Sequence, residues 1–179
     1  MRYKYKIPHG VRIMVECALC QYPTVSREIS TIESDMIPSA TQILSHTPVS
    51  GGGGESRPVE DVSMRIMRDN RLYYLKLIER VVWGYLDELC RAFMGYIDAS
   101  VPLGDDTIRY PLAADAPMSA RAAYDTSYLL LHCYINGSMP IDTAAVLIGA
   151  SSSRCYALLN VAYYTIACRM GWMRYQEAA

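Results

Sequence analysis

This 179-residue chain lacks an excess of charge of either sign, and it contains very little phenylalanine or tryptophan. Its formal net charge of −1 means that no global attraction draws it toward a polyanion such as nucleic acid. One phenylalanine and two tryptophans stand beside 15 tyrosines. Because a tyrosine ring can lie in a core while its hydroxyl reaches water, this composition predicts thin helical layers or oligomer interfaces.

Long apolar runs are also missing. No stretch approaches the ~20 apolar residues that span a bilayer, and residues 1–6 lack the apolar run of a secretory signal. We therefore expect a cytoplasmic protein with no membrane partner and with reduced cysteines. Cys17 and Cys20 could form half of a zinc site, but two cysteines on one helix is the favoured interpretation, since no second pair follows at a metal-ligand spacing. The cysteines expected to be buried, because they lie in apolar helical patterns, are Cys90, Cys133, Cys155 and Cys168.

The patterns of an enzyme are absent from the sequence as well. The three histidines, His9, His46 and His132, are scattered, and no nucleophile stands beside a base in a recognisable motif. The run Gly51–Gly54 is followed by Glu55, whereas a phosphate-binding loop continues with a lysine and a hydroxyl. We therefore predict no enzymatic activity, no cofactor and no bound metal.

What the sequence does contain is helical periodicity, with 51% hydrophobic residues to form a core. Residues 1–36 are predicted as an N-terminal helical arm with helices over 11–21 and 24–36, because Tyr22-Pro23 should break the first one. Residues 37–57 are predicted as a Gly/Ser-rich linker. Residues 58–98 contain one long helix over 60–97, with Gly84 as a point where it could bend. Its apolar stripe, at steps of three and four, comprises Leu75, Ile78, Val82, Tyr85, Leu89, Phe93 and Tyr96.

The C-terminal region carries the most specific pattern. After a predicted loop over 99–118, a helix capped by Ser119 should run to Ile135, within a C-terminal domain over 119–179. Residues 139–172 then read as a short helix, the break Gly149-Ala150-Ser151 and a longer helix, which is the layout of a helix-turn-helix. Gly149 is placed for a positive φ, and Ser151 for accepting a bond from a free amide of the next turn. We predict an all-α protein with a long central helix and a C-terminal helix-turn-helix.

A helix-turn-helix of this kind would read double-stranded DNA with the first turns of its second helix. The residues predicted to contact DNA are Ser152, Ser153, Arg154, Tyr156 and Asn160, since arginine can pair with guanine and asparagine with adenine. The residues predicted to face the core are Leu158, Val161, Ala162 and Ile166. From Arg121 to the end there are four basic and three acidic residues, so binding should be weak without dimerisation, the basic N-terminal arm or RNA polymerase.

Several short motifs follow one another along the chain: Tyr22-Pro23, Gly51–Gly54, Pro58-Val59-Glu60, Asp69–Leu72 and Gly149–Tyr156. Their order resembles the RinA and ArpU type phage transcriptional regulators, whose C-terminal part is similar to region four of sigma factors. The resemblance implies a phage-type transcriptional regulator that binds DNA through a sigma-like helix-turn-helix in the cytoplasm of a bacterial host cell. Regulators of that type usually carry several basic residues on the recognition helix, whereas Arg154 is the first charge here and Arg169 the next.

The alternative interpretation is a helical phage structural or DNA-packaging assembly protein, similar to a small terminase subunit. It would explain the tyrosine-rich faces, the long apolar stripe and the low charge. Either interpretation implies a homo-oligomer, because a long helix with one apolar stripe packs on partner helices or on a second copy.

Overall fold

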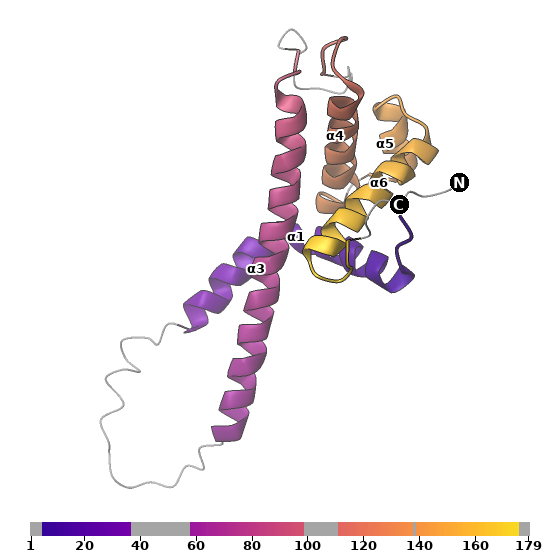
Figure 1. Cartoon of the computed structure of the whole chain (residues 1–179). Helices are drawn as coiled ribbons and strands as arrows, with labels where there is room; N and C mark the ends of the chain where they lie inside the picture. The colour runs from indigo at the N-terminus through magenta and orange to yellow at the C-terminus, as the bar shows by residue number, and fades with distance from the viewer. Residues whose placement is uncertain (1–4, 37–57, 99–110, 138, 176–179) are drawn as a thin grey trace, which may run out of the picture. The chain divides into compact units, whose positions relative to one another are not determined.

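The computed structural model describes residues 5–36, 58–98, 111–137 and 139–175 (Figure 1). Within these ranges the protein is all-α, as predicted, and contains no strand. The predicted linker over 37–57 and most of the predicted loop over 99–118 lie outside the described residues. In chain order, the elements are α1 (His9–Met36), α3 (Pro58–Met94), α4 (Met118–Leu129), a π-helical segment (Leu130–Ile135), α5 (Ile141–Leu147) and α6 (Ser152–Arg169).

The chain divides into two compact units, and each is described by itself. The larger unit comprises residues 1–23 and 80–179, and the smaller one comprises residues 24–79. Helices α1 and α3 therefore each contribute one part to each unit.

Pro23 lies inside α1, so the predicted break at Tyr22-Pro23 is wrong. A proline within a helix removes one backbone hydrogen bond and crowds the carbonyl four residues earlier, at a cost of about 3 kcal/mol. Leu19, one turn before it, is fully buried in the larger unit, and Val25 is fully buried in the smaller unit. Packing on either side of Pro23 outweighs its local preference, and the helix continues to Met36.

The smaller unit consists of two helical segments with a narrow core. Val25 and Ile29 of α1 and Leu75 and Ile78 of α3 are its buried apolar residues. Ion pairs join the segments at their surface, from Arg71 to Glu28 (2.6 Å) and from Lys76 to Glu33 (2.6 Å).

Helix α3 confirms the predicted long helix but ends three residues earlier than expected, at Met94. Tyr96 forms a turn by donating its N–H to the carbonyl of Phe93 (2.9 Å). Ile97 then pairs with Leu112 in an isolated antiparallel bridge. This contact draws the chain out of the helix, because Phe93 and Leu112 share one apolar cluster.

Helix α4 begins at Met118, so Ser119 is a residue of the helix and its predicted role as the cap is wrong. The side chain of Arg121 instead holds the preceding loop by donating to the carbonyls of Ala114 (2.6 Å) and Ala116 (3.0 Å). Beyond Leu129 the helix widens into the π-helical segment, which ends at Ile135 as predicted. Gly137 follows with a φ of +61°, a left-handed conformation that glycine adopts without strain.

Helices α4, α5 and α6 pack together in the larger unit, with α6 against both of the others (Figure 1). Of the α6 residues predicted to face the core, Ala162 and Ile166 are fully buried, while Leu158 and Val161 are half-buried. The thiols divide in a similar way, since Cys155 and Cys168 are buried whereas Cys90 and Cys133 are only half-buried. Cys17 and Cys20 share α1, as favoured, and both are exposed.

Candidate functional site

The connection between α5 and α6 contains the positive-φ glycine and the serine cap that the sequence predicts, but it begins at Ile148, one residue earlier than the predicted break. Helix α5 ends at Leu147 and α6 begins at Ser152, with Gly149 at a φ of +64° between them. The Gly149 N–H donates to the carbonyl of Val146 (3.1 Å), which closes the end of α5. The hydroxyl of Ser151 then accepts a bond from the backbone N–H of Arg154 (3.3 Å) and caps α6. This turn bends the chain by 110° between the two helices.

Small side chains and one polar contact hold α5 against α6. Ala144 and Ala145 of α5 are almost completely buried, which lets the helices approach closely. Ser152, in the first turn of α6, donates its hydroxyl to the carboxylate of Asp142, in the first turn of α5 (2.7 Å). The relative orientation of the two helices is therefore fixed at their N-terminal ends as well as at the turn.

Arg154, one of the residues predicted to contact DNA, reaches back to α4. Its guanidinium pairs with the carboxylate of Asp125 at 2.8 Å. The Asp125 side chain is 3% exposed and that of Arg154 is 40% exposed. The ion pair thus ties the start of α6 to the middle of α4.

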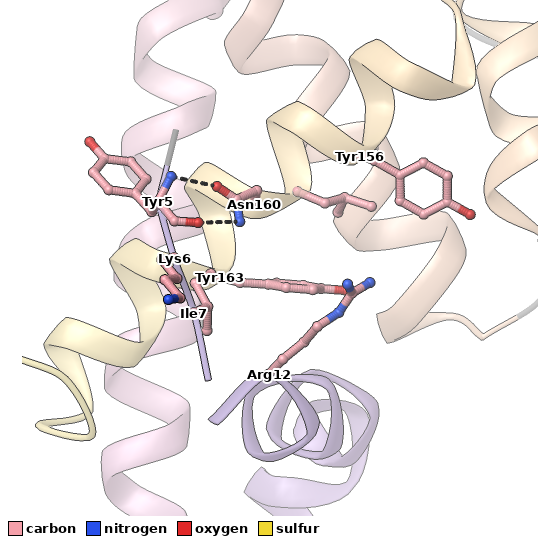
Figure 2. Close-up of a pocket in the computed structure, with 8 residues that line it drawn as sticks. Tyr5, Lys6, Ile7, Arg12, Tyr156, Asn160 and Tyr163 are labelled. Carbon is pink, nitrogen blue, oxygen red and sulfur yellow. Dashed lines mark hydrogen bonds between the residues drawn. The ribbon is translucent and has the colours of Figure 1, made fainter. Parts of the chain in front are cut away.

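Asn160 also has a hydrogen-bond partner within the chain. Its partner is the backbone of Tyr5, in the segment that precedes α1, which is called the N-terminal arm from here on. Its side-chain oxygen accepts the backbone N–H of Tyr5 (3.1 Å), and its side-chain nitrogen donates to the backbone carbonyl of Tyr5 (3.0 Å; Figure 2). The ring of Tyr5 also stacks on the ring of Tyr164, with centroids 3.8 Å apart and planes 4° apart. An extended segment of the arm is therefore held along α6 by one side chain and one ring.

A cavity of about 300 Å³ lies between this arm and α6. Figure 2 shows Arg12 of α1 directed toward α6, where its guanidinium lies 5.5 Å from the centroid of the Tyr163 ring. Arg12 also pairs with Glu16 (3.0 Å). Burial raises the pKa of the Tyr163 phenol, so this wall of the cavity stays neutral. We call this cavity the arm groove, and its lining residues are Tyr5, Lys6, Ile7, Arg12, Tyr156, Leu159, Asn160 and Tyr163.

The exposed side chains of Ser153 and Ala157, at the start of α6, are small and uncharged. Ser153 and Ala157, one turn apart, are exposed, and Tyr156 beside them is half-buried. Of the five predicted contact residues, Ser153 and Tyr156 therefore lie toward this face or the arm groove, whereas Ser152, Arg154 and Asn160 have partners within the chain. Whether any of the five contacts DNA stays a prediction.

Lys6 and Arg12 were not among the residues predicted for the site. The signal in the sequence was the basic, tyrosine-rich character of residues 1–10. Nothing in a local pattern shows that this arm lies against a helix that follows it by about 150 residues (Tyr5 and Asn160 are 155 positions apart).

The described residues show neither a metal site nor a single membrane-spanning helix. No group of three or more histidine, cysteine or acidic side chains is placed there to hold a metal ion. No single helix among them is long and apolar enough to cross a membrane; α5 and α6 qualify only as a pair bent by 110°. Burial of residues such as Leu159, Ala162 and Ile166 in the core accounts for the apolar character of α6.

Comparison with known proteins gives no relative for this chain: no protein-family model, no curated protein and no solved structure matches it.

Proposed function

We propose that α5 and α6 form a helix-turn-helix unit that binds double-stranded DNA, with the start of α6 entering the major groove, and that the protein is a phage-type transcriptional regulator. The observation that carries this proposal is the 110° bend between the two helices, made by a short turn with Gly149 and the capping Ser151. Helices joined at about 90–120° by a three- to four-residue turn, often with a glycine, are typical of this motif.

The exposed face at the start of α6 supports the same proposal. Base edges are contacted by the N-terminal residues of a recognition helix, and Ser153 with Ala157 forms the exposed face there. Small side chains allow the helix backbone to approach the groove closely. Ser153 and Tyr156 would then contact bases or phosphates.

The proposal is tested by placing a negative charge on this face. We expect Ser153→Glu to weaken DNA binding by about tenfold or more, because the carboxylate would meet phosphates at close range. The measurement is fluorescence anisotropy over a salt series, with labelled duplexes from the protein's own operon and a random-sequence duplex pool as probes.

A matched control is available at Ser119. It is also the second residue of its helix and is also exposed, and an acidic residue in a first helical turn is favourable for stability. Ser119→Glu adds the same charge and should leave DNA binding unchanged. Equal binding by both variants, or no salt-sensitive binding by the wild-type protein with and without RNA polymerase, would overturn the proposal.

One observation favours the alternative, a helical assembly protein of the DNA-packaging kind. Residues 64–71 of α3 are exposed throughout, and Met64, Ile66 and Met67 are each more than half exposed. Apolar side chains gathered on one helix often mark contact with another chain. The two functions differ in assembly size, which light scattering during size-exclusion chromatography measures. A dimer supports the regulator, whereas a ring-sized oligomer supports packaging.

A further inference from the structure

The proposed DNA-binding helix poses an electrostatic problem. Sequence-independent affinity for DNA comes from lysine and arginine side chains that neutralise backbone phosphates. Helix α6 has two charged side chains, and both face carboxylates within the chain. Arg154 pairs with Asp125 (2.8 Å) and Arg169 pairs with Glu88 (2.6 Å). Positive charge for the phosphates must therefore come from another element beside α6.

The N-terminal arm is held in a position where it can supply that charge. Asn160 bonds both backbone polar groups of Tyr5, and the Tyr5 ring stacks on Tyr164. These contacts fix the backbone of the residue directly before Lys6. Lys6 itself is exposed, so its ammonium group is available to a ligand at the rim of the arm groove.

Arg12 adds a second donor on the opposite wall of the same groove. A guanidinium carries five N–H donors, and the ion pair with Glu16 uses Nε of Arg12. The Arg12 side chain remains 40% exposed. Lys6, Arg12 and Glu16 together carry one net positive charge. Tyr156, one helical turn before Asn160, extends the groove toward the exposed face at Ser153.

We propose that the arm groove binds phosphodiester groups of the DNA backbone next to the segment that α6 contacts. Lys6 supplies the positive charge, Arg12 adds the N–H donors that its pair with Glu16 does not use, and Asn160 is a positioning residue that holds the arm on α6. This inference rests on the proposed DNA-binding function. It assigns to Asn160 a role different from base reading, because both ends of its side-chain amide bond the arm.

The first test removes one phosphate contact. Lys6→Ala should weaken binding to all duplex sequences by a similar factor, and the slope of log K against log salt should become shallower by about one. Lys6→Arg should keep the wild-type slope. The matched control is Arg80→Ala, which removes one exposed positive charge from α3 and should leave the slope unchanged. Equal slopes for the wild type and Lys6→Ala would overturn the inference while leaving the proposed function intact.

The second test separates positioning by Asn160 from base reading. If Asn160 holds the arm, Asn160→Ala should weaken binding equally for all sequences, and it should add little to the loss already caused by Lys6→Ala. A base-reading asparagine would instead give a loss confined to one position of the DNA site and fully additive with Lys6→Ala. The additive, sequence-specific result would overturn the positioning role.

A third test distinguishes binding of the DNA backbone from binding of a free anion. Inorganic phosphate, titrated calorimetrically into the full-length protein at constant ionic strength, should give no saturable binding. Saturable binding that disappears in Lys6→Ala, without a change in the salt slope for DNA, would reassign the groove to a small anion. If the wild-type protein binds no duplex at all, the proposed function fails, and this inference fails with it.

Discussion

The helical pattern of the sequence places Arg154 on the surface, but in the structure its side chain pairs with the buried carboxylate of Asp125. Asp125 is 2% exposed, and burying an isolated carboxylate is costly unless an opposite charge accompanies it. Arg154 supplies that charge from the first turn of α6. The pair therefore links the stability of the larger unit to the orientation of the proposed DNA-binding helix.

We predict that Arg154→Ala lowers the free energy of unfolding by about 3 kcal/mol, because it removes the arginine that pairs with the buried carboxylate of Asp125. This value is at the low end of the range for buried pairs, since Arg154 is partly exposed to water. Adding Asp125→Asn should recover part of the loss, because it removes the buried negative charge that Arg154 balances. Urea unfolding followed by circular dichroism measures both changes.

The control for this prediction is Arg91→Ala, which removes an exposed arginine from its pair with the half-buried Asp87 on α3. Ion pairs between helix residues four positions apart contribute about 0.3–0.5 kcal/mol. If Arg91→Ala and Arg154→Ala destabilise the protein equally, Asp125 does not depend on its partner as the structure indicates.

At the scale of the element, the turn between α5 and α6 depends on the backbone conformation of Gly149. Its φ of +64° lies in the left-handed region, which costs other L-residues roughly 1–2 kcal/mol. A Cβ added at Gly149 would meet no atom within 4 Å, so the cost of a substitution there comes from the backbone alone.

Two glycine substitutions should therefore have opposite effects. Gly149→Ala should lower the free energy of unfolding by about 1–2 kcal/mol. Gly84→Ala should raise it by about 0.5–1 kcal/mol, because Gly84 lies within α3, where alanine is the better helix former and a Cβ would again meet no atom within 4 Å. Thermal or urea unfolding of both variants provides the measurement, and a stabilising Gly149→Ala would contradict the turn geometry.

At the scale of the whole molecule, buried tyrosines make stability sensitive to alkaline pH. Burial raises the pKa of Tyr85 to about 12, with the Glu88 carboxylate adding to this effect and Arg169 opposing it. Burial also raises the pKa of Tyr134 and of Tyr163. These phenols keep their protons in the folded chain under conditions where the unfolded chain releases them.

The stability contributed by Tyr85 should be fully present below about pH 10, the ordinary pKa of the phenol in the unfolded chain, and should be lost as the pH rises toward 12. The protonated phenol of Tyr85 reduces the free energy of unfolding by about 1.4 kcal/mol per pH unit in that window. Urea unfolding at several pH values should give a shallower decline for Tyr85→Phe than for the wild type. Identical declines would show that Tyr85 ionises equally in both states.

The sequence by itself determined the features that depend on neighbours within one or two helical turns. The apolar steps of three and four specify α3, and they come from residues that share one face of the same helix. The positive φ of Gly149 and the cap at Ser151 follow from the chemistry of the turn itself. In each case the partner atoms lie within a few positions along the chain, so the pattern contains both sides of the interaction.

Only the tertiary structure decided what depends on partners far away in sequence. Pro23 stays within α1 because buried residues on both sides of it outweigh its local cost. Arg154 pairs with a carboxylate 29 positions away, and Asn160 holds a backbone segment 155 positions away. A helical pattern gives the face on which a side chain lies but not the segment that packs against that face. The inward roles of Arg154 and Asn160 were therefore fixed by the packing of α4 and the N-terminal arm on α6.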